Sequence, residues 1–140
     1  MNLSNIIYKE DLKFNPDLLK REHFVQRHYE EVLFHLAEEL IPPHKVILQE
    51  FFRNPNQKLS IAKNQFPYDL SLLKPSLMEH WILWSKEPLE DNQVTSFLDQ
   101  WCEKKDVYAI WENADSLKSV KELYHYHFIL KGESQLASSI

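Results

Sequence analysis

The stretch that decides the fold lies near the C-terminus and reads YHYHFIL, residues 124–130. Aromatic and aliphatic residues alternate with histidines along it. This is the pattern of a β-strand, because successive side chains of a strand point to opposite faces of a sheet. His125 and His127 therefore share one face. The other face carries Tyr124, Tyr126, Phe128 and Leu130. The stretch predicts a sheet with one apolar side and one side on which two imidazoles lie close together.

Two upstream segments have the same strand-like character. Residues 79–85, EHWILWS, and residues 107–111, VYAIW, are both rich in aromatic and branched side chains and are bounded by turn residues. With the last strand at 123–130, the sequence predicts a small sheet of about three strands.

Helical spacing dominates the N-terminal half. Asn15-Pro16 has the composition of a helix start, and apolar residues recur at helical spacing from there to about residue 40. Pro42-Pro43 ends that helix and opens a second one, which Asn54-Pro55 ends. A third helix is expected from residue 91 or 92 to 101, between the first two strands. Residues 54–78 hold three prolines and no clean period, which favours a long connection.

The order of these elements predicts one α+β domain over residues 1–140. N-terminal helices precede a small sheet with one intervening helix, and the helices are expected largely on one face of the sheet. The core is expected at about residues 15–131, with residues 1–14 and 132–140 loosely attached.

Composition excludes several classes of function. The net charge of −5 and the absence of a Lys/Arg run argue against nucleic-acid binding. The single glycine, Gly132, excludes the glycine-rich loops that cradle phosphates. No apolar run reaches the length of a membrane span, and the N-terminus does not resemble a secretory signal. With Cys102 as the single cysteine, we expect a soluble protein of the reducing cytoplasm.

Five short motifs, in order, resemble the N-acetylglucosamine-induced protein family, a domain of unknown function known chiefly from fungi. They are FPYDL at 66–70, EHWILWSK at 79–86, WEN at 111–113, SLKSV at 116–120 and HYHF at 125–128. The resemblance spans about residues 15–131. Members often have proline where this chain has Ala114, and tryptophan where it has Tyr124. The resemblance implies the positions of a site and no particular reaction.

Histidines form the candidate site. If strand 79–85 lies beside the last strand, His80 joins His125 and His127 on one face. We expect a polar pocket lined by these three residues, with Glu112 and Asn113 at its rim.

Three interpretations of this pocket remain open from sequence. Three imidazoles can hold zinc or another divalent ion, with Glu112 as a fourth ligand or as the base for a bound water. Without a metal, histidines can bind an anion and move protons. The histidines can instead be structural, bonded to one another or to Glu112. A histidine-triad hydrolase would need another histidine where this chain has Ile129.

Further polar residues complete the candidate list. The residues expected to contact a ligand are Asn113, Ser116, Lys118, Ser119 and Tyr68. The candidates for catalysis are His80, His125, His127 and Glu112. We expect a regulatory module that binds a small anionic ligand or a protein partner. The alternative is a hydrolase acting on a phosphate-bearing substrate, either metal-dependent or using histidine acid–base catalysis.

Overall fold

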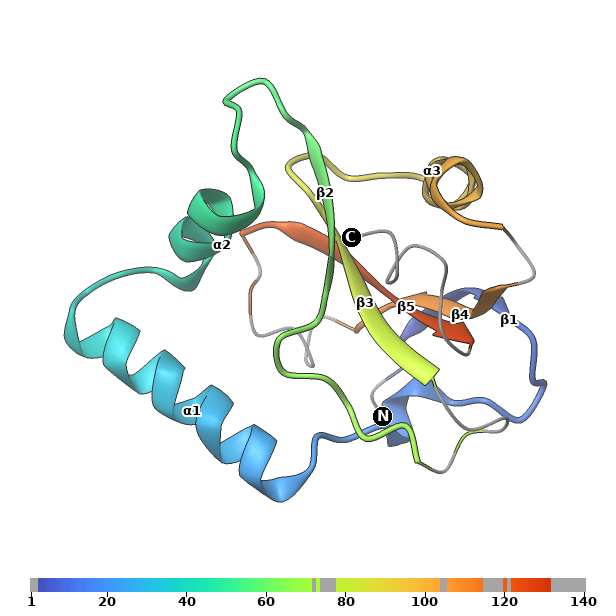
Figure 1. Cartoon of the computed structure of the whole chain (residues 1–140), viewed down its shortest axis with the longest axis horizontal. Helices are drawn as coiled ribbons and strands as arrows, with labels where there is room; N and C mark the ends of the chain where they lie inside the picture. The colour runs from blue at the N-terminus through green and yellow to red at the C-terminus, as the bar shows by residue number, and fades with distance from the viewer. Residues whose placement is uncertain are drawn as a thin grey trace.

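A five-stranded antiparallel sheet forms the centre of the molecule (Figure 1). The computed structural model describes residues 3–71, 73, 78–103, 106–114, 120 and 122–131. The strands are β1 (Asn5–Lys9), β2 (Leu59–Lys63), β3 (Met78–Ser85), β4 (Val107–Glu112) and β5 (Tyr124–Lys131). Their order in the sheet is β1-β4-β5-β3-β2, so β5 is the central strand.

The helical elements whose bounds lie within the described part of the chain are the 3₁₀ turn η1 (Pro16–Leu18) and the α-helices α1 (His23–Glu38), α2 (Pro43–Phe51) and α3 (Asp91–Trp101). Their ends follow the sequence signals. The Asn15 side chain accepts a hydrogen bond from the backbone of Asp17, and Pro43 occupies the first turn of α2. A reciprocal pair of hydrogen bonds between Glu90 and Gln93 caps α3. Over the described residues, no helix has the length and apolar character that crossing a membrane requires.

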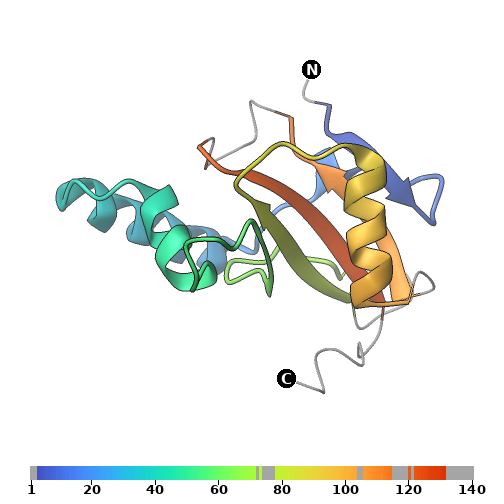
Figure 2. The same ribbon diagram turned by 90° about the horizontal axis from the view of Figure 1, so that it is seen from above.

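The two faces of the sheet differ in chemistry. An apolar core lies between one face of the sheet and α3. The strands contribute the buried side chains of Trp81, Leu83, Phe128 and Leu130, and α3 contributes Val94 and Leu98. The opposite face, here called the histidine face, consists of the side chains of His80, Ile82, Trp84, Trp111, His125, His127 and Ile129. Figure 2 shows α3 on one side of the sheet and α1 with α2 on the other.

Two of the five strands were not expected from sequence. β1 lies within residues 1–14, which the sequence suggested were loosely attached, and it pairs with β4. Phe14 is buried against Tyr108 and Trp111. β2 lies within the expected connection 54–78 and pairs with β3. Both are five-residue strands at the edges of the sheet. Pairing with a neighbour stabilises such a strand more than any periodicity of its own.

The expectation that the helices gather on one face was also wrong. α3 packs on the apolar core face through Val94 and Leu98, whereas α2 contacts the histidine face through Ile47, Leu48 and Phe51. The physical reason is that both faces carry large apolar side chains, and each therefore needs cover. Residues 132–140, which the sequence suggested were loosely attached, lie outside the described residues.

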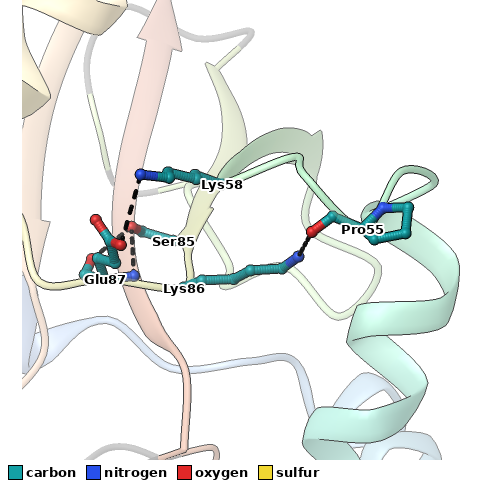
Figure 3. Close-up of polar contacts among 5 residues, drawn as sticks. All are labelled: Pro55, Lys58, Ser85, Lys86 and Glu87. Carbon is teal, nitrogen blue, oxygen red and sulfur yellow. Dashed lines mark hydrogen bonds and ion pairs between the residues drawn. The ribbon is translucent and has the colours of Figure 1, made fainter.

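Polar contacts join the neighbouring loops at the end of the sheet where β2 begins and β3 ends (Figure 3). Ser85 Oγ donates to the Glu87 carbonyl oxygen, and the Glu87 backbone N–H donates back to Ser85 Oγ at 3.2 Å. Lys58 Nζ lies 3.7 Å from the Glu87 carboxylate, and Lys86 Nζ donates to the Pro55 carbonyl oxygen at 3.2 Å. These contacts join the loop before β2 to the loop after β3.

Replacing Leu98 by alanine should destabilise the fold. Leu98 is 1% exposed between α3 and the apolar core face, so truncation leaves a cavity. We expect a loss of about 2–5 kcal/mol in the free energy of unfolding, measured by urea denaturation. Leu12→Ala is the matched control because Leu12 is 87% exposed. Its effect should stay within about 0.5 kcal/mol. Equal losses in the two variants would contradict the packing described here.

Candidate functional site

The pairing of β3 with β5 gathers the three histidines on one face. Ile82 lies opposite His127, Trp84 opposite His125, and His80 opposite Ile129. His80 and His127 are thus diagonal neighbours on adjacent strands of the same face, close enough for their rings to meet. His80 Nε2 lies 2.8 Å from His127 Nδ1, and both side chains are only 3% exposed. The site is built around this buried hydrogen bond between two imidazoles.

The loop that follows β2 holds the His80 end of the pair. The backbone N–H of Tyr68 donates to His80 Nδ1 at 3.1 Å. Asn64 Nδ2 lies 3.5 Å from both nitrogens of the same ring. Asn64 Oδ1 accepts from the Phe66 backbone N–H at 2.8 Å, so the nitrogen of this side-chain amide faces His80. The Tyr68 backbone N–H is therefore the donor directed at one particular nitrogen of His80, whereas the Asn64 amide is equally far from both nitrogens.

Asn113 holds the His127 end of the pair. Asn113 Nδ2 lies 3.1 Å from His127 Nε2 and donates to the Tyr68 hydroxyl at 3.1 Å. Asn113 Oδ1 accepts from the Trp111 indole N–H at 2.7 Å. An indole N–H can only donate, so this contact fixes which end of the amide is oxygen. Asn113, which the sequence suggested lay at the rim, contacts the histidine pair directly.

Aromatic rings enclose the pair and keep water away. His127 stacks on Trp111 with ring centroids 5.2 Å apart, and Tyr68 stacks on it at 5.7 Å. Burial lowers the pKa of His80 to about 3, with a further contribution from the positive charge of Arg21. Burial also holds the pKa of His127 well below its usual range. Both rings are therefore neutral at pH 7, and neither is tuned for general acid–base catalysis near neutrality.

His125 lies on the same face but outside this hydrogen bond. Its ring packs against Trp84 with centroids 4.9 Å apart and meets His127 edge-on at 5.3 Å. It faces the cavity described below. The three predicted histidines thus lie side by side, but only His80 and His127 bond to each other.

The remaining predicted residues divide into three groups. Tyr68 contacts both rings of the pair through its own ring, its backbone and its hydroxyl. Glu112 follows Trp111 in β4, so strand alternation directs it to the other face, and the structure does not bring it to the histidines. Ser116, Lys118 and Ser119 lie outside the described residues.

The geometry of the pair differs from that of metal ligands. Nitrogens that bind zinc direct their lone pairs at an ion about 2.0–2.1 Å away. Here His80 Nε2 and His127 Nδ1 are directed at each other across a hydrogen bond. Within the described residues, no group of three His, Cys, Asp or Glu side chains is arranged to hold a metal ion.

A cavity of about 320 Å³ lies between the helices and the histidine face. Its floor includes His125, His127, Asn113 and Trp84, and the loop after β2 contributes Asn64, Phe66 and Tyr68. The helical walls are mainly apolar. Their apolar residues are Tyr29, Val32, Leu33 and Leu36 of α1 and Val46, Ile47 and Phe51 of α2, and the polar side chains of Gln26 and Glu50 also line the cavity. The cavity therefore has an apolar body that ends on a small polar floor.

Arg21 ties the start of α1 to this site. Its Nε donates to the Phe66 carbonyl oxygen at 2.7 Å, and its guanidinium lies over the rings of Tyr29, at 4.3 Å, and Tyr68, at 5.1 Å. The guanidinium also lines the cavity. A cation with aromatic neighbours is thus placed at the boundary between the apolar walls and the polar floor.

Sequence reasoning missed Arg21, Asn64 and the helical walls. The apolar spacing of α1 and α2 was visible, but it is the ordinary signal of a helix that packs on a core. Asn64 and Arg21 carry no local pattern, because their roles depend on contacts 16 and 45 residues away.

No family model, curated protein or solved structure matches this chain.

Burial of the neutral pair should make the protein sensitive to mild acid. Both histidines have folded-state pKa values below the unfolded value near 6.5, so the unfolded chain binds more protons as the pH falls. Between pH 6.5 and 5 we expect the free energy of unfolding to fall by about 1–2 kcal/mol for each of the two histidines. Urea denaturation at several pH values measures this decrease.

The variant His127→Gln should lose about half of that pH dependence, because one of the two buried imidazoles is gone. The comparison uses the change between pH 6.5 and 5 within each protein, so a general loss of stability does not affect it. A wild-type stability that is independent of pH over this interval would show that the pair is not buried and neutral.

Proposed function

We propose that this chain is a small-ligand binding protein whose ligand occupies the cavity between α1, α2 and the histidine face. The observation that carries the proposal is an apolar cavity of about 320 Å³ that ends on buried polar groups. Binding sites for small molecules have this character: walls that are mainly apolar and a few polar groups that fix orientation. Their volumes run from about 300 Å³ upward, so a cavity of this size suits a small molecule rather than a peptide.

The incomplete burial of the apolar side chains of α1 and α2 supports this assignment. Neither α1 nor α2 contains a fully buried residue, although both have an apolar stripe. The residues Val32, Leu33 and Leu36 are half-buried along the cavity wall. Apolar side chains that line a space and do not fill it gain from a guest that removes them from water.

Binding is a better account of the site than hydrolysis. A general base works best with a pKa near the operating pH. Burial lowers the pKa of His80 to about 3 and that of His127 well below normal. The pair therefore has the chemistry of a fixed hydrogen-bonding surface. Membership of the N-acetylglucosamine-induced protein family, a regulatory role and a cytoplasmic location remain predictions from the sequence.

A fluorescent apolar probe tests the cavity. We expect 1-anilinonaphthalene-8-sulfonate to bind the native protein saturably with one site per chain. The variant Leu36→Gln places an amide in the apolar wall and should weaken binding by about tenfold, since burying an amide without a partner costs about 1–3 kcal/mol.

Phe34→Gln is the matched control because Phe34 lies on the same helix, is 62% exposed and is absent from the cavity wall. It should leave probe binding unchanged. Equal loss in both variants would mean that the probe binds the outer surface of α1. No saturable binding to the wild-type protein would argue against a ligand-accessible cavity.

A further inference from the structure

The hydrogen bonds around the histidine pair contain one proton too many, and this surplus defines what a ligand must supply. The inference rests on the proposed function, because it concerns the floor of the same cavity. Two neutral imidazoles have four ring nitrogens and two N–H protons. Each ring therefore offers one donor and one acceptor. Protonating either ring would add another donor, and burial lowers the pKa of both.

Both ends of the pair are bounded by groups that can only donate. At one end the Tyr68 backbone N–H points at His80 Nδ1. At the other end the amide nitrogen of Asn113 faces His127 Nε2. The Trp111 indole N–H prevents this amide from turning over, because turning would place two donors 2.7 Å apart.

The pair cannot satisfy both ends at once. If His80 accepts from Tyr68, its proton is on Nε2 and points at His127 Nδ1. His127 then carries its own proton on Nε2, where it meets the N–H of Asn113. If His127 instead accepts from Asn113, the same reasoning brings the His80 Nδ1 proton against the Tyr68 N–H. As long as the two rings bond to each other, one of the two outer contacts is therefore donor against donor.

Two observations place the conflict at the Asn113 end. The Tyr68 N–H belongs to the backbone and cannot rotate away, whereas the Asn113 amide keeps a good partner in the Tyr68 hydroxyl. His127 and Asn113 also line the cavity, and His80 does not.

We propose that the ligand presents an oxygen acceptor to His127 Nε2–H and Asn113 Nδ2–H, and that its apolar body fills the space below α1 and α2. One oxygen can accept from both donors, since they lie 3.1 Å apart. A buried donor without an acceptor is costly, so a carbonyl or carboxylate oxygen gains more here than at an already satisfied site. Arg21 and Lys63 line the same cavity with two positive charges against the one negative charge of Glu50, and this balance also favours an oxygen with negative charge.

The protonation of the rings tests the premise in the wild-type protein without a ligand. Long-range ¹H–¹⁵N correlation spectra distinguish a protonated ring nitrogen from a bare one. We expect both His80 and His127 to carry their proton on Nε2. A proton on Nδ1 of His127 would place the conflict at Tyr68 and would overturn the proposal.

A matched pair of probes tests the ligand chemistry. Acetophenone and ethylbenzene have the same skeleton and differ by a carbonyl oxygen. We expect acetophenone to bind about tenfold more tightly, the worth of one well-placed hydrogen bond, measured from shifts of the Trp84 indole N–H signal. Benzoate is the third probe. Tighter binding of benzoate than of acetophenone identifies a carboxylate, and weaker binding identifies a neutral carbonyl, as the preferred acceptor.

Asn113→Asp tests the assignment of the acceptor to this contact. A carboxylate can accept from both Trp111 and His127, so the surplus donor disappears. The two probes should then bind with about equal affinity. Gln100→Glu makes the same amide-to-carboxylate change at an exposed position of α3, away from the cavity, and should keep the preference. If Asn113→Asp does not fold, the ring tautomers and the probe pair in the wild-type protein still decide.

The outcomes separate this inference from the proposed function. Equal binding of acetophenone and ethylbenzene would overturn the acceptor but leave the cavity as a binding site. Binding of neither probe, together with no saturable binding of the fluorescent probe, would overturn both.

Discussion

The register of β3 against β5 is the constraint on which the rest of the site depends. With Ile82 opposite His127, the His80 ring reaches His127 and the two imidazoles form a 2.8 Å hydrogen bond on the histidine face of the sheet. A slip of one residue would send the histidines of one strand to the apolar core face. There they would meet Leu83 and Phe128, side chains that offer no hydrogen-bonding partner. The imidazole pair and the register therefore support each other.

The buried pair also determines where the surrounding segments lie. Polar groups out of contact with water must find partners within the protein, so each ring nitrogen needs a group opposite it. The loop after β2 supplies the Tyr68 backbone N–H, and the residue after β4 supplies the Asn113 amide. Arg21 then fastens the start of α1 to that loop. A chain of contacts thus runs from the centre of the sheet to the helix that walls the cavity.

Sequence alone could predict the faces of the strands and not their partners. Alternation in residues 79–85 and 124–130 correctly placed His80, His125 and His127 on one side, because the period of two follows from backbone geometry. β1 and β2 were missed because short edge strands are defined by pairing with distant residues. The donors that complete the site were hidden for a related reason. A backbone N–H has no side-chain signature, and the indole of Trp111 read as an apolar residue of its strand.

The incomplete packing of the histidine face is where fold and function meet. On the opposite face, Val94 and Leu98 of α3 are fully buried, so side chains of the protein fill the space between that face and α3. On the histidine face, α1 and α2 direct their apolar stripes at the sheet but bury no residue completely. Closer packing would fill the space from which an oxygen can reach Asn113 and His127, so their two donors would stay without an acceptor. The proposed acceptor site therefore depends on the helices leaving this face incompletely covered.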